Sequence, residues 1–348
     1  MSAIPPPPEV NPAKAEAVLE LLRGAGTVGE RAEVSALTQL EGGWSRHTYM
    51  LTVTDPEAAE PLELIARVRP ADSVLDTDLG QEFAIYQAIA DEPIPSPQVH
   101  GYEPAEETPF EGPFFLMDKL PGKAVNVWRQ RDRDELTANW DGGRSLAEDF
   151  VDRMAAIHAV DPAKLAGAAV ARDFRQTVAH WRGIYEEVHL VNDPVVEEAY
   201  AWVLDNEPDP VAPRLVHGDY RIGNCLIDGG RLSGVLDWEL SSIGDPRFDL
   251  GYLSLDYHGG RFVTPGSPLA GAVAERDWFE RRYEAASGQP VDRSVVNVYA
   301  ALGALMLFSI MGTGLKLYSN GESSDIRAAW SRFVFPGLRA DLAKLMGW

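Results

Sequence analysis

Apolar residues follow two different patterns along this chain. In the first third they form short runs separated by turns, and the run from Leu62 to Val68 has the length and composition of a buried strand. Beyond Gly122 they recur every three to four positions, as between Leu146 and Val160, which is the period of an amphipathic helix. Strands followed by helices predict an α+β chain in two parts rather than a parallel α/β fold.

The same patterns locate the individual elements. Strands are expected at residues 34–40, 48–53, 62–68, 98–102, 114–117, 215–216, 225–227 and 232–236. Helices are expected at residues 11–23, 79–90, 146–160, 174–188, 194–204, 278–286 and 328–346, and another is expected to start at 251–256. The change of pattern places a domain boundary near Asp118, which divides the chain into residues 1–118 and 119–348.

One uncharged segment, Ser294 to Leu315, is long enough to cross a bilayer. Its interior holds the polar residues Asn297, Ser309 and Thr313 together with three glycines, and the chain has no second segment of this kind to pack against it. This content favours a buried helix of the larger part over a membrane span. We therefore expect a cytoplasmic protein with no membrane partner.

Residues 214–250 carry the densest group of chemically useful side chains. Two short strands around the Gly229-Gly230 turn would bring the side chains of Asp219, Asn224 and Asp237 together. Carboxylate and amide oxygens are hard ligands that suit Mg²⁺ held against phosphate oxygens. Each residue alone could instead form a turn or cap a helix. The joint spacing of the three favours a site.

The motifs in this segment resemble those of the aminoglycoside phosphotransferase family, which includes choline-kinase-like and hydroxyacyl-CoA-kinase-like members. They are H-G-D-x-x-x-x-N, L-D-W-E and G-D-P-x-x-D-L. The resemblance implies a bilobal protein-kinase-like fold with a small β-rich N-lobe and a larger, mainly helical C-lobe. It implies that Asp219 is the catalytic residue and that Asn224 and Asp237 are metal ligands. His217 is then expected to brace the loop rather than to act as the base, and Asp249 is expected to cap or brace the loop.

In the N-lobe, the resemblance assigns nucleotide-binding roles to the glycine turn at Gly42 and Gly43 and to a phosphate-contacting cation at Arg67. The glycine turn could equally be an ordinary hairpin turn. Arg69 projects from the same strand face as Arg67 and is the alternative cation. Glu82, in the next helix, is expected either to pair with Arg67 or to lie on a solvated helix face.

The resemblance also implies a hinge whose backbone meets the adenine edge of a nucleotide. This hinge would run from Met117 through Asp118 to Leu120, directly after the last N-lobe strand. A plain strand followed by a turn is the alternative interpretation, because only the order of elements supports the hinge.

The charge and the cysteine content of the chain limit the kinds of partner and compartment that we expect. With 31 Lys and Arg against 53 Asp and Glu, the net charge of −22 argues against nucleic acid or an anionic membrane as a partner. It is compatible with a cationic substrate, although acidic surfaces also serve solubility. The only cysteine, Cys225, excludes an intramolecular disulfide and fits a reducing compartment.

Three functions remain after these arguments. The favoured one is an ATP- and Mg²⁺-dependent small-molecule O-phosphotransferase acting on a hydroxyl acceptor. A protein kinase is disfavoured because the chain has H-G-D and D-W-E where protein kinases have H-R-D and D-F-G. The third is a catalytically weak nucleotide-binding regulatory module. The sequence leaves open the acceptor (an aminoglycoside, another amino alcohol or a hydroxyacyl thioester), the choice of ATP over GTP, and the oligomeric state.

Overall fold

A computed structural model of the chain describes residues 10–40, 45–70, 73, 75, 77–188, 193–262, 266–323 and 325–348. The chain divides into two compact units. The N-terminal unit comprises residues 1–90 and 97–120, and the C-terminal unit comprises residues 91–96 and 121–348. The first is a sheet with two helices and the second is mainly helical, so the predicted α+β class is confirmed.

The N-terminal unit is built on one antiparallel sheet with the strand order β1-β2-β3-β5-β4. Its strands are β1 (Glu33–Leu40), β2 (His47–Thr54), β3 (Leu62–Val68), β4 (Val99–Glu103) and β5 (Phe114–Asp118). Its helices are α1 (Pro12–Gly24) and α2 (Leu79–Ala88). All seven elements match expected ones to within two residues at each end.

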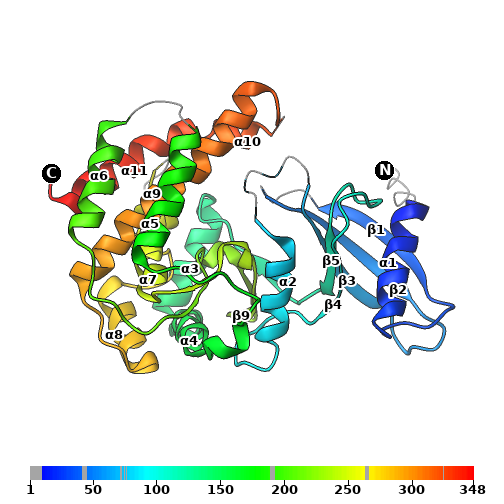
Figure 1. The fold of residues 1–348 in the computed structure, drawn as a ribbon. Coiled ribbons are helices and arrows are strands. Elements are labelled where there is room, and N and C mark those ends of the chain that lie inside the picture. Colours follow the sequence, from blue (N-terminus) through cyan, green and yellow to red (C-terminus); the bar gives the residue numbers. More distant parts are fainter. Residues whose placement is uncertain are drawn as a thin grey trace, which may run out of the picture. The chain divides into compact units, whose positions relative to one another are not determined.

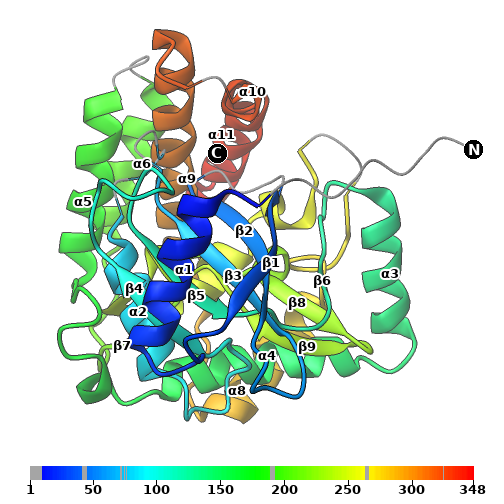
Figure 2. The same ribbon diagram turned by 90° about the vertical axis from the view of Figure 1, so that its right-hand side faces the viewer.

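Strand alternation gives this sheet two apolar faces. Phe114 and Leu116 of β5 join the core under α1, whereas Phe115 between them contacts the rings of Phe83 and Tyr86 in α2. Figure 2 shows α1 lying across its face of the sheet. The sheet is therefore covered by one helix on each side, and each helix is held by side chains from alternate strand positions.

The first turn of α2 is fixed by its cap. The Asp78 carboxylate accepts a hydrogen bond of 2.8 Å from the backbone N–H of Gly80. Such a cap satisfies a backbone donor that the helix itself leaves open. Glu82, one turn further on, is buried and contacts Arg67 of β3.

The C-terminal unit contains nine described α-helices and two small sheets. The helices are α3 (Gln130–Asp141), α4 (Ser145–Ala159), α5 (Phe174–Val188), α6 (Pro194–Asp205), α7 (Arg247–Leu253), α8 (Arg276–Ser287), α9 (Arg293–Asn320), α10 (Ile326–Ala329) and α11 (Ser331–Met346). The sheets are β6-β8-β9 and β10-β7, with β6 (Lys123–Ala124), β7 (Arg214–Val216), β8 (Cys225–Asp228), β9 (Arg231–Val235) and β10 (Ser242–Gly244).

The long helix α9 forms the centre of this unit. It packs against α5, α6, α7, α10 and α11 (Figure 1). Among the described residues it is the one helix that is long and apolar enough to span a membrane, and 89% of its most apolar window is buried inside the structure. The expected buried helix is thus confirmed, and its uncharged stretch is explained by packing on several sides.

Helix α7 corrects one predicted boundary. A helix was expected to start at Gly251, but α7 begins at Arg247. The Asp245 carboxylate accepts a hydrogen bond of 2.9 Å from the Arg247 backbone N–H, and Pro246 precedes the first turn. The first turn carries charged residues that obscure the apolar period, so the pattern alone placed the helix start too late.

Candidate active site

Backbone pairing in the C-terminal unit brings the predicted site residues together. The H-G-D loop (residues 217–219) follows β7 and leads into a short 3₁₀ turn, Ile222–Asn224. The Leu236 N–H donates a hydrogen bond of 2.9 Å to the Asn224 carbonyl, which sets the end of β9 beside that turn. Asp237 follows directly, so the three predicted residues come from two backbone segments that are hydrogen-bonded to each other.

The Asp219 carboxylate is held by three side chains. Asn224 Nδ2 donates to its Oδ2 at 2.7 Å, and the Tyr252 hydroxyl donates to its Oδ1 at 2.8 Å. Arg221 Nε lies 3.1 Å from both oxygens. A carboxylate with this many donors has a fixed direction and a stabilised negative charge.

The surroundings of Asp219 also set its protonation state. Burial acts to raise the pKa of the carboxyl, but Arg221, and after it His258 and Tyr252, outweigh burial and hold the pKa below its usual range. Asp219 is therefore ionised at neutral pH and can accept a hydrogen bond from a hydroxyl group.

A buried network of hydrogen bonds holds the backbone of the H-G-D loop. Asp249 accepts hydrogen bonds of 2.9 Å from the backbone N–H groups of His217 and Gly218. Its Oδ2 also lies 3.0 Å from His158 Nε2, and His158 Nδ1 lies 2.7 Å from the Tyr283 hydroxyl. The chain from α8 through α4 and α7 fixes the loop backbone, as expected for Asp249 in its bracing role.

His217 links the two halves of the site. Its Nε2 bonds to the Leu236 carbonyl at 3.1 Å, and its Nδ1 accepts a hydrogen bond of 3.3 Å from the Asp219 N–H. Burial lowers the pKa of His217, so the ring is neutral and donates through Nε2. Both ring nitrogens are occupied by backbone groups, which makes His217 a brace, in line with the prediction.

Asn224 and Asp237 have the donor groups that a hard cation requires. The Asn224 amide nitrogen is used by the carboxylate and carbonyl oxygens of Asp219, which leaves its amide oxygen for another partner. Asp237 adopts a left-handed backbone (φ 71°, ψ 60°), which is uncommon for a residue with a side chain. No three His, Cys, Asp or Glu side chains gather as a metal site in the described part of the chain. These two residues fit Mg²⁺ only if phosphate oxygens complete its ligands.

In the N-terminal unit the expected ion pair is present. Arg67 Nη2 lies 3.0 Å from Glu82 Oε1, and Glu82 is fully buried. Arg69 instead bonds to Glu106, so of the two candidate arginines Arg67 is the one paired with α2. Arg46 adds a second cation, with Nε 3.6 Å from Glu82 Oε2. The sequence reasoning missed Arg46, although its place just before an expected strand, now β2, was a usable signal.

The predicted hinge coincides with the end of β5. Met117 is buried and pairs with strands on both sides, and the Asp118 N–H donates to the Gln98 carbonyl at 2.9 Å. Leu120 follows the strand and is half-buried. The adenine-binding role of these residues stays a prediction.

The glycine turn expected over the nucleotide, Gly42 and Gly43, lies outside the described residues. The strands that flank it are described and pair as expected, with Leu40 opposite Thr48. The pairing of β1 with β2 is therefore confirmed, and the role of the turn between them stays a prediction.

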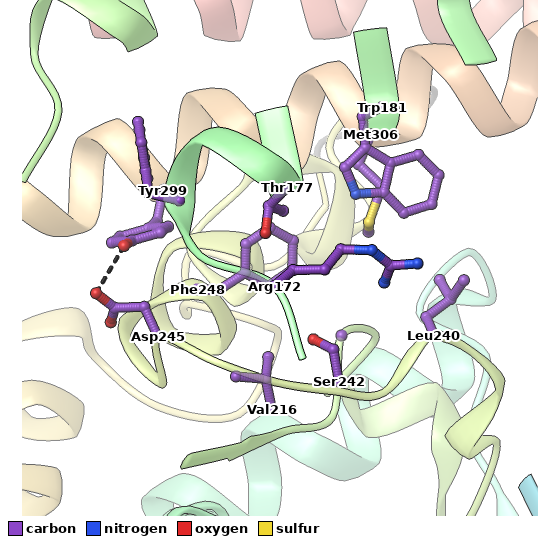
Figure 3. Close-up of a pocket in the computed structure, with 12 residues that line it drawn as sticks. Arg172, Thr177, Trp181, Val216, Leu240, Ser242, Asp245, Phe248, Tyr299 and Met306 are labelled. Atoms are coloured by element: carbon purple, nitrogen blue, oxygen red, sulfur yellow. Dashed lines mark hydrogen bonds between the residues drawn. The ribbon is translucent and has the colours of Figure 1, made fainter. Parts of the chain in front are cut away.

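A small cavity borders the H-G-D loop within the C-terminal unit (Figure 3). Its volume is about 40 Å³. We call it the α5–α9 pocket, since those helices supply much of its wall. It is lined by Arg172, Phe174, Thr177, Trp181, Val216, Gly218, Leu240, Ser242, Asp245, Phe248, Tyr299 and Met306.

Comparison with known families decides the class of protein. The sequence model of the phosphotransferase enzyme family (APH) matches residues 36–288, which is most of the chain. The chain belongs to this family. The match includes the H-G-D loop, Asn224 and Asp237 of this phosphotransferase, together with Arg67 and Glu82.

Curated relatives of this phosphotransferase are distant and mostly longer. Mouse acyl-CoA dehydrogenase family member 10 is 28% identical over 230 residues, covering 64% of this chain and 20% of that protein. Human acyl-CoA dehydrogenase family member 11 is 25% identical over 248 residues, covering 69% and 30%. Hygromycin-B 4-O-kinase of Escherichia coli is 28% identical over 124 residues, covering 34% and 33%. The chain thus spans about a fifth to a third of the length of these relatives.

Solved structures share the fold of this phosphotransferase over nearly their whole length. A putative aminoglycoside phosphotransferase from Ralstonia eutropha superposes with a TM-score of 0.72 at 22% identity, covering 95% of this chain and 98% of that chain. Aminoglycoside phosphotransferase APH(4)-Ia, in a ternary complex with AMP-PNP and hygromycin B, superposes with a TM-score of 0.58 at 21% identity, covering 91% and 96%. The predicted fold is confirmed.

Sequence reasoning also missed Tyr252 and His258, two residues beside Asp219 in the candidate site. Tyr252 lies three residues after Asp249 on α7, a spacing that places both on one helix face, so a signal existed. His258 is buried beside the Tyr252 ring at a centroid distance of 4.3 Å. Its position depends on the fold of residues after α7, and no local pattern indicated it.

Proposed function

We propose that this phosphotransferase transfers the γ-phosphoryl group of ATP to a hydroxyl group of a small molecule. The observation that carries the proposal is the state of Asp219. It is an ionised carboxylate, held by Asn224, Arg221 and Tyr252, on a loop whose backbone N–H groups are fixed by Asp249. This arrangement suits a group that orients an incoming hydroxyl and receives its proton.

The proposed reaction is an in-line displacement. A bond forms between the acceptor oxygen and the γ-phosphorus, while the bond from the γ-phosphorus to the β–γ bridging oxygen breaks. The bridging oxygen leaves with the bonding electrons as part of ADP, and the hydroxyl proton passes to the Asp219 carboxylate. The tight hydrogen bonds to Asp219 keep it in line with the acceptor, which is the positioning that this chemistry requires.

Asn224 and Asp237 are the proposed ligands of Mg²⁺, through the amide oxygen of the former and the carboxylate of the latter. When bound, the ion supplies positive charge that neutralises the triphosphate. Arg67, directed by Glu82, is the proposed phosphate-contacting cation of the N-terminal unit. Protein kinases use a lysine at this position. The planar guanidinium of an arginine suits phosphate oxygens equally well.

Two observations support the use of a nucleotide as the phosphoryl donor. The structurally similar APH(4)-Ia was solved with AMP-PNP and hygromycin B, which supports nucleotide use in this fold. The sequence match also includes Asn224 and Asp237, the residues that fit a phosphate-bound cation. We also propose that the protein is located in the cytoplasm, where ATP is available.

The variant Asp219→Asn tests the proposal. It removes the proton acceptor but keeps the shape of the side chain, so turnover should fall by at least about a hundredfold. ADP release is measured with Mg²⁺ and ATP across a panel of hydroxyl acceptors, and ATP affinity is measured by calorimetry. We expect ATP affinity to change by less than about threefold, since Asp219 is assigned to the acceptor and not to the nucleotide.

Asp228→Asn is the matched control, because Asp228 is exposed at the end of β8 and has no assigned role. It should turn over at the wild-type rate. If the Asp219 variant also kept that rate, the role of Asp219 would be wrong. If the wild-type protein bound ATP and transferred phosphate to no acceptor, it would be the nucleotide-binding module considered above.

A further inference from the structure

The α5–α9 pocket holds one cation whose side chain has no hydrogen-bond or ion-pair partner among the described residues. This cation is Arg172, which is half-buried in the pocket wall. Its backbone is firmly placed, because its N–H donates to the Ile243 carbonyl at 2.9 Å and the neighbouring Ala171 forms a parallel bridge with Ile243. The structure therefore fixes where the side chain starts and leaves the guanidinium available.

The one carboxylate in the pocket wall is already neutralised. Asp245 accepts hydrogen bonds from Arg247 Nε at 2.9 Å and Nη2 at 2.5 Å, and from the Tyr299 hydroxyl at 2.7 Å. In Figure 3 the Arg172 side chain extends away from Asp245, toward Trp181 and Leu240. The pocket thus presents an uncompensated positive charge.

The electrostatics of the neighbourhood agree with this geometry. Burial lowers the pKa of Arg172, and no carboxylate acts to raise it. Burial, and after it the charge of Arg172, lower the pKa of the nearby His180. A guanidinium stays protonated under such conditions, so its burial is a cost that a bound anion would offset.

The rest of the wall combines apolar side chains with hydroxyl groups. Trp181, Met306 and Phe248 are buried side chains that face the cavity, and Ser242 adds a hydroxyl group (Figure 3). Gly218 of the H-G-D loop, one residue before Asp219, forms part of the pocket wall. An occupant would therefore contact apolar surface and a cation at a site that adjoins the proposed reaction centre.

We propose that the α5–α9 pocket is an acceptor subsite that binds an anionic group, a carboxylate or a phosphate, carried on an apolar chain. This inference rests on the proposed function, and it specifies the acceptor as an anionic hydroxyl compound. It runs against the weak preference for a cationic acceptor that the net charge of −22 suggested. The charge within contact distance decides recognition, because charges further than about 8 Å are screened at physiological ionic strength.

A matched set of probes tests the subsite by binding alone. The probes are 6-hydroxyhexanoate, 6-hydroxyhexyl phosphate, the neutral 6-hydroxyhexanamide and the cationic 6-aminohexan-1-ol. We expect the two anionic probes to bind at least about tenfold more tightly than the other two by calorimetry, as for a charge-assisted hydrogen bond. Comparison of the carboxylate with the phosphate identifies which anion the pocket prefers.

Three variants assign the binding to Arg172. Arg172→Gln should abolish the preference for anionic probes, and Arg172→Lys should retain part of it because the charge remains. Arg175→Gln is the control, since Arg175 lies three residues further along the chain, in the first turn of α5, but is exposed and paired with Glu207. Equal affinity for all four probes, or an unchanged preference in Arg172→Gln, would overturn the subsite.

Turnover is measured separately, as ADP release with each probe. Selective binding without ADP release would support the subsite and contradict the proposed phosphoryl transfer. ADP release with no preference for anionic acceptors would support the transfer and overturn the subsite. The two proposals therefore fail in different measurements.

Discussion

Asp219 owes its ionised state to side chains from three parts of the C-terminal unit. Arg221 and Asn224 lie within five residues of it in the sequence, but Tyr252 comes from α7 and His258 from the turn that follows. The local residues explain why the motif alone indicated the site. Arg221 has the largest effect in lowering the pKa of the carboxyl; the distant residues add to it, and they became visible only in the folded structure.

Removal of the Tyr252 hydroxyl should change the pH dependence of turnover. This hydroxyl stabilises the charged form of Asp219, so Tyr252→Phe should raise the pKa of that carboxyl. Turnover requires the ionised form and is lost as pH falls through the pKa, so the acid limb of the kcat profile should move to higher pH. Tyr318→Phe, at a partly exposed position of α9, is the control and should leave the limb in place.

The same variant has a consequence for stability with a defined sign. A carboxyl whose folded-state pKa is lowered stabilises the fold above its unfolded-state pKa, and this contribution is lost as pH falls through the folded-state value. The difference in stability between wild type and Tyr252→Phe should therefore be present at neutral pH and shrink in acid. A difference that grew in acid would contradict the assigned hydrogen bond.

At the scale of elements, the H-G-D loop is held by a close approach of two backbone segments. Gly218 has φ +83°, and a Cβ atom at this position would lie 2.3 Å from the Leu240 carbonyl oxygen. Neither the backbone angle nor the space admits a side chain. The glycine of the motif is thus required by the packing of the loop against the turn that carries Asp237.

Gly218→Ala should destabilise the protein by at least about 3 kcal/mol in urea unfolding and should also reduce turnover, because the loop must shift. Gly167→Ala is a matched control, since Gly167 has φ +82° with nothing within 4 Å of its added Cβ. It should cost only the left-handed strain of about 1–2 kcal/mol. Equal losses in the two variants would mean that the contact with Leu240 is unimportant.

The predictability of the elements depended on how strongly each buries an apolar face. Helix α5 was predicted at its observed limits, Phe174–Val188. Helix α3 was missed because only Leu136, Trp140 and the polar Arg133 of its twelve residues are buried, so it has little apolar period. Strand β10 was missed because three residues that pair with a distant strand leave no local pattern. Among the site residues, those that stand in or beside a recognisable motif, Asp249 of α7 included, were predictable, whereas Tyr252 and His258 were not.

At the scale of the whole molecule, the excess of acidic residues acts on stability. A net charge of −22 disfavours the compact state through self-repulsion. Many of the described ion pairs are at the surface, such as Arg31–Glu57, and such pairs contribute little each. Salt that screens the repulsion over the whole surface should therefore change stability more than salt that screens the individual ion pairs.

Added NaCl should raise the melting temperature. Screening shortens the range of the repulsion from about 8 Å at 0.15 M salt to about 3 Å at 1 M. We expect the melting temperature to rise by roughly 2–4 °C for each kcal/mol of stability gained. Differential scanning fluorimetry over this range measures the effect, with KCl as a check that the identity of the cation is unimportant. A fall in melting temperature would mean that surface pairs dominate.

At Arg172 the backbone contributes to the fold, and the side chain is left to contact an acceptor. Its main chain is part of the pairing with β10, whereas its guanidinium has no partner in the described part of the chain. An exchange of this side chain would alter the charge that an acceptor meets and would break no described hydrogen bond of the side chain. Divergence of substrate preference along this lineage could thus proceed through single codon changes at residue 172 while the architecture stays the same.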